Sequence, residues 1–294
     1  MISIAYTPAT IQGQEIKCKG IARLNRIDMK KSNYYDYIAQ IYDQTRWLTE
    51  SVAEEVADFI LKLTCATPDT SFLEPGVGTG LNVIPLVKRG YAVTGIDASQ
   101  EMLDQFRHKL NVTSPNLNLI YGDASQLPFP DNSFDIVLTV HMIHTVSDWR
   151  VFLDNIDRVL KSRGFYLNCQ WITPPARREF EGYFRDILSK YEGAKQKSPS
   201  INIAIEKIDI EGYLQRKGYV SNYFVAKEWR VSNTVEELLS FFKARAYGLC
   251  WQVSDDIFHQ VINEFEEFCI NHYGSLKTNL SSEAKFEIWA YKAI

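Results

Sequence analysis

The sequence lacks the features that mark several classes of protein. Its five cysteines are odd in number, scattered and without C-x-x-C spacing, which argues against a disulfide framework and a cysteine-based zinc site. No run of about 18 apolar residues is present, so we expect no membrane span. The N-terminus also lacks the charged start and long apolar core of a signal peptide. We therefore expect a reduced, cytoplasmic protein without a bound metal.

The sequence also has no excess of positive charge. It contains 32 Lys and Arg against 36 Asp and Glu, a formal net charge of −4, and so offers no general electrostatic reason to bind nucleic acid. Hydrophobic residues make up 46% of the 294 residues, an ordinary fraction for a globular protein that is long enough to bury a full core. The composition leaves the oligomeric state open.

What the sequence does contain, from about residue 70 on, is an alternation of short β-rich runs and helical stretches. This alternation is typical of a parallel sheet with crossover helices. The run 134–140 is continuously apolar, as expected of a central strand that is buried on both faces. Strict alternation over 285–291 instead predicts an antiparallel last strand with unlike faces. Further strands are predicted at 71–74, 91–97, 117–121, 164–171 and 222–229.

These strands predict a Rossmann-like α/β fold with a seven-stranded, mostly parallel sheet and a helical cap insert. Ser99 is a suitable N-cap for a helix to about residue 110, and Thr234 and Glu237 form a potential capping box in the insert. Before the sheet, the segment 34–63 predicts one or two helices that lie across its C-terminal edge.

The expected organisation is a short extension followed by one domain. Residues 1–31 carry six basic against two acidic side chains and are expected to be poorly ordered. Residues 32–294 form the domain, with a ligand-binding core at about 34–172 and the cap and C-terminal strands at about 173–294.

The most informative segment has the sequence FLEPGVGTG and spans residues 72–80. It predicts a buried strand, a glycine turn and a helix that starts near residue 79. Gly76, Gly78 and Gly80 allow a tight turn whose backbone N–H groups come close to a ligand. Dinucleotide-binding fingerprints place the third glycine one step later, where this chain has Leu81. Glu74, at the end of the strand, would repel a pyrophosphate but suits a cationic amino group.

Acidic residues follow three successive strands. Glu74 closes the first strand, Asp97 closes the second, and Asp123 follows the third. Because ligands of open α/β sheets bind at the carboxyl ends of the strands, we expect these three acids to surround one site. Asp97 comes 21 residues after Gly76, a spacing typical of a carboxylate that accepts both hydroxyls of a ribose.

Four segments together resemble the ordered motifs of class I S-adenosylmethionine (SAM) methyltransferases, in particular the ubiquinone/menaquinone-methyltransferase-like group. They are EPGVGTG at 74–80, GIDAS at 95–99, GDA at 122–124 and FDIV at 134–137. The resemblance covers roughly residues 34–172 and implies that SAM is the cofactor.

The resemblance also implies a role for each motif. The glycine turn would pack against the methionine part of SAM, and Asp97 would bind the ribose. Ala98 and Met102 would flank the adenine, while Asp123, between Gly122 and Ala124, would bind its exocyclic amine.

The segment before the core, YDYIAQIYD at 35–43, resembles the pre-domain helix of the same group. In related enzymes a Tyr and a following Arg of this helix reach the carboxylate of the cofactor. The resemblance therefore nominates Tyr42 and Arg46.

The chemistry expected of such a site is an in-line displacement at an activated methyl group, which needs alignment more than acid–base help. His141 and His144 follow the fourth strand directly. One of them could act as a base or a substrate anchor, or one could contact the cofactor or backbone while the other packs. Of the two, His141 is nearer to the strand end. The cap is expected to supply the acceptor pocket, with these residues as candidates: Trp171, Tyr183, Tyr247 and Trp251 for its wall and Arg245 for an acidic substrate.

The expected function is methyl transfer to the O, N or C atom of a small-molecule metabolite. One alternative is a methyltransferase that acts on a macromolecule. Nucleic-acid amino-methylating enzymes usually carry an Asn/Asp-Pro-Pro-aromatic segment after the fourth strand, whereas this chain has VHMIH at 140–144. The other alternative is a non-catalytic SAM-binding regulatory or assembly protein, which would use the same cofactor contacts.

Overall fold

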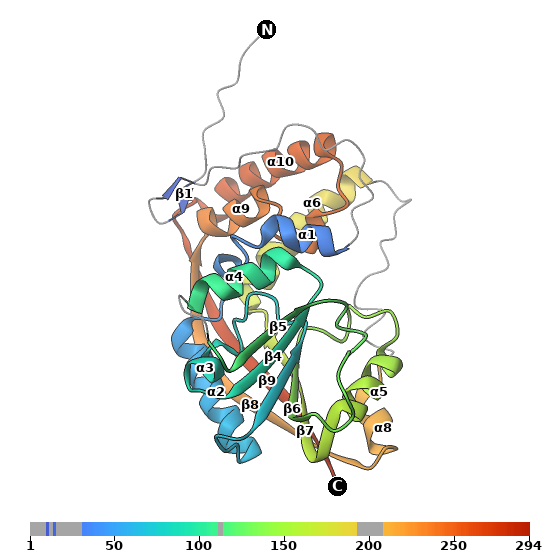
Figure 1. Cartoon of the computed structure of the whole chain (residues 1–294). Helices are drawn as coiled ribbons and strands as arrows, with labels where there is room; N and C mark the ends of the chain where they lie inside the picture. Colours follow the sequence, from blue (N-terminus) through green and yellow to red (C-terminus); the bar gives the residue numbers. More distant parts are fainter. Residues whose placement is uncertain (1–9, 12–13, 16–30, 111–113, 193–207) are drawn as a thin grey trace.

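The computed structural model describes residues 10–11, 14–15, 31–110, 114–192 and 208–294, and a seven-stranded sheet lies at its centre (Figure 1). The extension expected at 1–31 therefore lies almost wholly outside the described residues. Within it, β1 (Thr10–Ile11) and β2 (Gln14–Glu15) form a separate antiparallel pair. The sheet consists of β3 (Ser71–Pro75), β4 (Ala92–Asp97), β5 (Leu117–Tyr121), β6 (Phe134–Val140), β7 (Leu160–Ile172), β8 (Tyr219–Thr234) and β9 (Asn279–Ala293).

The strand order is β5-β4-β3-β6-β7-β9-β8. The first five strands in this order are parallel, and β9 inserts antiparallel between β7 and β8. The chain thus moves outward from β3 to β5 and then returns to the other side of β3 at β6. The predicted fold class, with its antiparallel last strand, is confirmed. The reversal also places the carboxyl ends of β3, β4 and β6 beside the crevice in which such sheets bind ligands.

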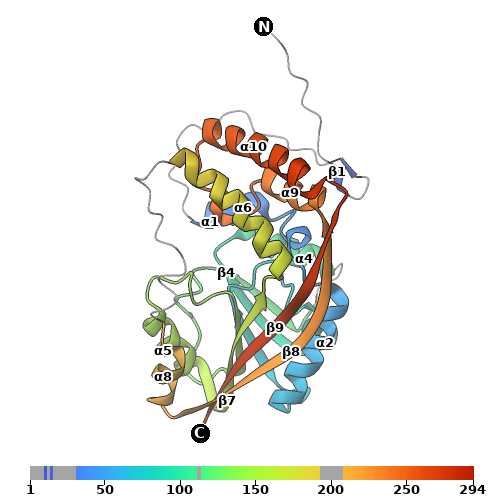
Figure 2. The same cartoon turned by 180° about the vertical axis from the view of Figure 1, so that it is seen from behind.

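Helices cover both faces of the sheet, because its central strands are apolar on both sides (Figures 1 and 2). One face packs against α2 (Glu50–Thr64), α3 (Ile84–Lys88) and α4 (Gln100–Leu110). The other face packs against α5 (Trp149–Val159) and α8 (Ile210–Gln215). Ser99 caps α4 as predicted, since its hydroxyl accepts the Met102 N–H at 3.1 Å.

The segment before the sheet divides into two helices with different positions. In α1 (Lys31–Ile38), Tyr34 and Ile38 pack with Met102 of α4 at the C-terminal edge of the sheet, as expected. The expectation is wrong for α2, which packs on the sheet face against α3 and β8. The apolar side of α2 is extensive enough to cover strands, with Val52, Val56 and Ile60 all buried.

The glycine turn continues further than the sequence suggests. The predicted helix start near residue 79 is wrong: α3 begins at Ile84, with Pro85 in its first turn. Gly80 has a φ of +76°, which an α-helix cannot accommodate. The turn therefore leaves a longer stretch of irregular backbone next to the ends of β3 and β4.

The cap consists of α6 (Pro175–Glu192), α9 (Val235–Lys243), the short 3-10 turn Gly248–Cys250 and α10 (Asp255–Tyr273). Its core is built of phenylalanines, including Phe180, Phe242 and Phe265. Two strands carry this cap: β8 and β9 remain paired up to Thr234 and Asn279, past the last pair of β9 with β7 at Ile172 (Figure 2). The polar loop predicted at 195–200 lies outside the described residues. No helix in the described part of the chain is both long and apolar enough to cross a bilayer.

The predicted capping box at the junction of β8 and α9 is present. The Thr234 hydroxyl accepts the Glu237 N–H at 3.1 Å, and the Glu237 carboxylate accepts the Thr234 N–H at 3.1 Å. We expect Thr234→Ala to lower the free energy of unfolding by about 1 kcal/mol, measured by urea denaturation. Ser254→Ala is the matched control, because Ser254 is the N-cap of α10 but makes no side-chain capping bond. Equal losses in the two variants would contradict this role of the box.

Candidate functional site

The three glycines of the turn after β3 all have left-handed backbone. Their φ angles are +72° at Gly76, +53° at Gly78 and +76° at Gly80, a region that costs other residues free energy. A Cβ on Gly80 would lie 2.6 Å from the Phe106 ring, so this glycine also serves packing. A Cβ on Gly78 would meet no atom within 4 Å. The turn is thus tightly packed against the core at Gly80 and has open space beside Gly78.

Asp97 holds this turn in place from the neighbouring strand. Its carboxylate accepts the Gly78 N–H at 2.7 Å and the Ser99 N–H at 2.9 Å. Burial raises the pKa of Asp97 while these backbone bonds lower it, and burial has the larger effect. Asp97, which is predicted to bind the ribose, therefore also links the loop after β3 to the loop after β4.

Glu74 is the most buried acid of the described residues, with 1% of its surface exposed. Its Oε1 accepts a hydrogen bond from Asn82 Nδ2 at 2.8 Å, whereas Oε2 is buried without a partner among the described residues. Burial, together with the nearby charge of Asp97, raises the pKa of Glu74 to about 8. An unpartnered buried oxygen is costly, and it is what an acid that awaits a hydrogen-bond donor would present.

The remaining predicted cofactor residues lie on the next two strand ends and on α4. Asp123 is exposed, and its carboxylate accepts the Ser125 N–H at 2.8 Å. Gly122 donates its N–H to the Asp97 carbonyl at 2.9 Å, which brings β5 alongside the same site. Ala98 is exposed, whereas Met102 is buried beneath α1 and Ala124 lies in the core beside α5.

Tyr42 and Arg46 flank the short 3-10 turn Asp43–Thr45. The Arg46 guanidinium lies over the Tyr42 ring at 4.1 Å, and its Nε is buried without a partner in the described part of the chain. Its charge contributes to the low pKa of His141, so Arg46 lies near the end of β6. A guanidinium in this position is suited to bind a carboxylate.

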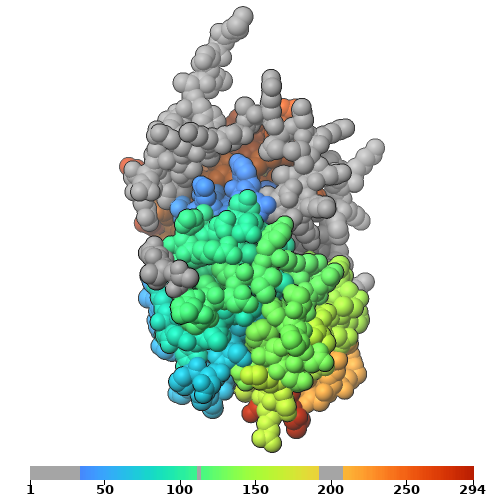
Figure 3. All heavy atoms as spheres, viewed as in Figure 1, coloured from blue at the N-terminus to red at the C-terminus, as the bar shows by residue number. Residues whose placement is uncertain are grey.

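Two acids that the sequence analysis missed attach the pre-domain segment to this edge. Asp43 accepts the Thr79 hydroxyl at 2.5 Å and pairs with Lys109 of α4, and Asp36 accepts the Ser99 hydroxyl at 2.5 Å. Figure 3 shows α1 (blue) directly above α4 (teal) on the molecular surface. The only signal for these contacts was the acidic character of the 35–43 segment, which names no partner.

The two histidines after β6 differ in environment. His141 has a φ of +53° and its Nε2 accepts the Trp171 N–H at 3.0 Å. Burial, with the charges of His144 and Arg46, lowers the pKa of His141 to about 3, so the ring is neutral at physiological pH. His144 is exposed in a turn, and no helix begins here. Since Nε2 is already bonded, His141 has an N–H to donate rather than a free lone pair.

The predicted acceptor-side residues lie in two groups. Trp171 and Tyr247 are buried beneath the cap, and Trp251 stacks on Tyr34 with ring centroids 3.6 Å apart. Arg245 instead pairs with Asp255 at 2.7 Å and lies over the Phe258 ring. Tyr183 donates to Glu179 at 2.9 Å and packs on Phe268. Trp171 thus lies at the end of β7, Tyr247 contacts α6 and Trp251 packs on α1, whereas Arg245 and Tyr183 make contacts within the cap itself.

Arg177, in the first turns of α6, was missed by the sequence analysis. Its guanidinium is 4% exposed, bonds to the Thr45 carbonyl at 2.6 Å and to the Tyr247 hydroxyl, and pairs with Glu181 at 3.4 Å. Arg177 thereby joins the pre-domain segment to the cap. Its helical spacing from Glu181 was the only available signal.

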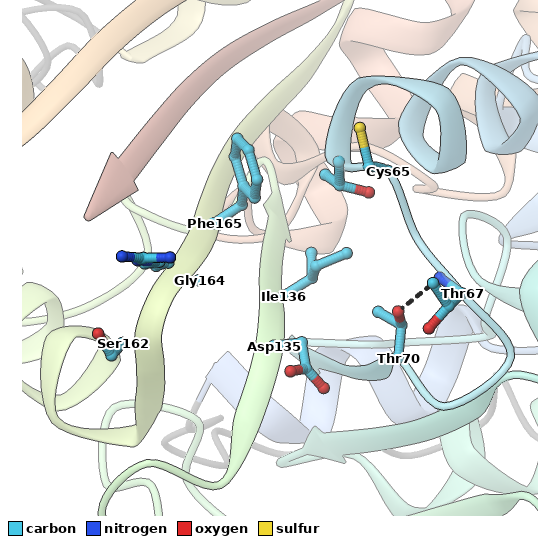
Figure 4. A pocket seen from close by; sticks show the side chains of 10 residues that line it. Cys65, Thr67, Thr70, Asp135, Ile136, Ser162, Gly164 and Phe165 are labelled. Atoms are coloured by element: carbon cyan, nitrogen blue, oxygen red, sulfur yellow. Dashed lines mark hydrogen bonds between the residues drawn. The ribbon is translucent and has the colours of Figure 1, made fainter. Parts of the chain in front are cut away.

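A cavity of ≈190 Å³ lies at the opposite end of the sheet (Figure 4). It is lined by Thr64, Cys65, Asp135, Ser162 and Phe165, among others, at the amino ends of β6 and β7. Parallel sheets bind cofactors at their carboxyl ends, so this cavity is not the cofactor site.

Residues 73–168 match the family model described as a methyltransferase domain. The demethylmenaquinone methyltransferase of Tropheryma whipplei strain Twist is 33% identical over 162 residues, which cover 53% of this chain but only 64% of that protein. The demethylmenaquinone methyltransferase of Clavibacter sepedonicus is 30% identical over 172 residues, covering 55% of this chain and 69% of that protein. The chain belongs to the class I SAM-dependent methyltransferases, in the ubiquinone/menaquinone-methyltransferase-like group.

Solved structures agree on the fold. The YcgJ protein of Bacillus subtilis superposes with a TM-score of 0.50 at 18% identity, covering 81% of this chain and 97% of that one. The [4+2]-cyclase SpnF superposes with a TM-score of 0.51 at 15% identity, covering 89% and 95%. At these identities the likeness shows the fold alone.

SAM is the cofactor of the family to which this chain belongs, and the residues present fit it. Gly78 leaves open space for a ligand, Glu74 holds a buried oxygen ready for a donor, and Arg46 has a buried donor without an acceptor. The open space at Gly78 lies in the turn after β3, the buried oxygen of Glu74 at the end of β3, and the buried donor of Arg46 in the segment in front of the sheet.

We expect Gly78→Ala to weaken SAM binding at least tenfold, because its methyl group would enter the open space beside the turn. The unfolding free energy should fall by about 1–2 kcal/mol, the strain of a left-handed alanine. Gly90→Ala is the matched control, since Gly90 has a φ of +88° and open surroundings in the turn before β4. Calorimetric titration and thermal unfolding of both variants would check this. A similar loss of SAM affinity in both would show that strain, and not ligand space, is responsible.

Proposed function

We propose that this protein transfers the methyl group of SAM to an oxygen, nitrogen or carbon atom of a small-molecule metabolite. The observation that carries the proposal is the state of Glu74, a fully buried carboxyl with one oxygen unpartnered, directly before a turn that is open at Gly78. A ligand with a positively charged donor would satisfy that oxygen best, because hydrogen bonds between charged groups are the strongest. The amino group of SAM has this charge.

The roles that we propose for the other cofactor residues follow from the family resemblance. Asp97 would accept the ribose hydroxyls, and Arg46, supported by Tyr42, would bind the carboxylate. Asp123 would accept the exocyclic amine of adenine, with Ala98, Met102, Gly122 and Ala124 around the ring. When bound, SAM supplies a sulfonium methyl that is already activated for displacement.

The protein itself would contribute alignment and exclusion of water on the acceptor side. The cap covers the ends of β6 and β7, where Trp171, Tyr247 and Trp251 would form the wall of the acceptor pocket. His141, neutral and with Nε2 bonded to backbone, fits an anchor that donates a hydrogen bond to the acceptor better than a general base. Holding the acceptor in line at short distance is the main requirement of such a displacement.

Arg245 and Tyr183 would contact the acceptor only if the cap rearranges around it. The exposed His144 would approach the acceptor from the turn after β6. A non-catalytic SAM-binding protein would use the same cofactor contacts, because a shared fold does not decide the reaction. Detection of a methylated product would separate the two roles. We propose the cytoplasm as the compartment, on the free thiols of the four described cysteines.

The first experiment is a calorimetric titration of the purified chain with SAM, S-adenosylhomocysteine and NAD. We expect micromolar binding of the two sulfur nucleotides and none of NAD, because Leu81 stands where the dinucleotide-binding fingerprint has its third glycine. Binding of NAD alone would refute the proposal.

We expect Asp97→Ala to weaken SAM binding by roughly 1.5–3 kcal/mol, the scale of charge-assisted hydrogen bonds. Asp135→Ala is the control: Asp135 also accepts a backbone N–H, from Ser71 at 2.9 Å, but it lies at the start of β6, at the opposite end of the sheet. It should cost stability without changing SAM affinity. Unchanged affinity in a folded Asp97→Ala protein would rule out the ribose contact.

A further inference from the structure

A chain of three buried side chains connects the glycine turn to the strand that leads into the cap. Trp171 Nε1 donates to Asn82 Oδ1 at 3.1 Å, and Asn82 Nδ2 donates to Glu74 Oε1 at 2.8 Å. Each of the three residues is less than one-tenth exposed. Trp171 is the penultimate residue of β7, only four residues before α6 begins at Pro175. No role in the proposed chemistry has so far been given to Asn82.

The chemistry of the three groups fixes their orientation. An indole N–H can only donate, so the Asn82 carbonyl must face Trp171, and its NH₂ group must then face Glu74. This arrangement occupies one oxygen of Glu74 and leaves Oε2 buried and unpartnered among the described residues. Without Asn82, either oxygen of Glu74 could turn away from the space for SAM. Without Trp171, the Asn82 carbonyl would lose the hydrogen bond that sets the orientation of its amide group.

The groups that titrate near Glu74 are Asp97 at the end of β4 and Cys169 of β7. Burial and, to a smaller extent, the charge of Asp97 raise the pKa of Glu74 to about 8, although the hydrogen bond from Asn82 acts to lower it. At neutral pH the unliganded carboxyl therefore holds its proton. Binding of a cationic amino group would favour the ionised form and release that proton.

We propose that Asn82 is a positioning residue that presents the free oxygen of Glu74 to the amino group of SAM, and that Trp171 controls this presentation from the acceptor side. The inference rests on the proposed function, because it is the SAM amino group that Glu74 would receive. The inference connects the SAM side of the site with its acceptor side. Any methyl acceptor that shifts the Trp171 indole changes the affinity for SAM. By the same coupling, SAM changes the affinity for that acceptor.

The sign of the pH dependence follows from the same groups. Affinity for SAM rises as the pH approaches about 8, because Glu74 ionises more easily, and it falls again when the ligand's own amino group loses its proton near a similar pH. Removal of the Asn82 hydrogen bond takes away an interaction that lowers the pKa of Glu74. In a plot of SAM affinity against pH, the rising limb should then move to higher pH.

The test is calorimetric titration of the full chain from pH 6 to about 9.5 with two ligands. One is SAM, and the other is 5′-methylthioadenosine, which keeps the nucleoside but has neither the amino group nor the carboxylate. We expect Asn82→Ala to weaken SAM binding at pH 7 about tenfold, the effect of about one pKa unit, and to shift the rising limb upward. Binding of 5′-methylthioadenosine should change less than about twofold.

Trp171→Phe removes the indole donor but keeps an aromatic, though smaller, side chain, so we expect the same changes with smaller amplitude. Trp47→Phe is the matched control, since its ring packs edge-on against Trp171 with centroids 6.1 Å apart and its Nε1 has no partner in the described part of the chain. Asn82→Asp preserves the volume of the side chain should the alanine variant fail to fold. A carboxyl beside Glu74 would share one proton with it, so the rising limb should again move to higher pH.

The outcomes separate this inference from the proposed function. If the wild-type chain binds neither ligand, the proposed function fails and the inference fails with it. If the wild type binds both ligands but Asn82→Ala, or Asn82→Asp in its place, leaves the SAM affinity and its pH profile unchanged, the inference alone is overturned. Equal loss of both ligands would also overturn it, because that result describes general damage to the site.

Discussion

The cofactor edge of this protein depends on one backbone constraint, the left-handed conformation at Gly76, Gly78 and Gly80. It turns the chain away from helix formation immediately after β3 and leaves N–H groups without intrahelical partners. The Asp97 carboxylate takes one of these, that of Gly78, and thereby joins the ends of β3 and β4. Glu74 can remain buried with a free oxygen only because the turn directs the backbone past it. The backbone conformation of the turn therefore determines where the side chains of the site can lie.

Local patterns in the sequence were sufficient to predict the sheet and the strand ends at which Glu74 and Asp97 lie. Strands with continuous apolar runs, such as Phe134–Val140, can be found because burial on both faces leaves no room for polar residues. Acids at strand ends can be found because parallel strands share one carboxyl edge. The helix start near residue 79 was missed for a physical reason as well: a glycine motif shows that the turn is tight but not how many residues it uses before α3 begins at Ile84.

The rest could not be predicted because it consists of contacts between segments that are remote in the sequence. Asp43 and Thr79 are 36 residues apart, Trp171 and Asn82 are 89 apart, and Arg177 and Thr45 are 132 apart. Periodicity shows that a side of α2 is apolar, but it does not say whether that side covers a sheet face or a sheet edge. Likewise Arg245 has the composition of a substrate ligand, and only the fold reveals Asp255 beside it.

The paired extension of β8 and β9 allows the distance between cap helices and sheet to vary, whereas the glycine turn on the cofactor side is fixed by its backbone conformation. The cap helices α9 and α10 follow a two-stranded ribbon that continues after β7 has ended, so the distance of these two helices from the sheet depends on ribbon length. Adding two residues to each strand would preserve which side chains face inward and raise these helices by about 7 Å. Paired insertions in β8 and β9 would therefore change the distance of α9 and α10 from the sheet, while the glycine turn and its acids stay unchanged.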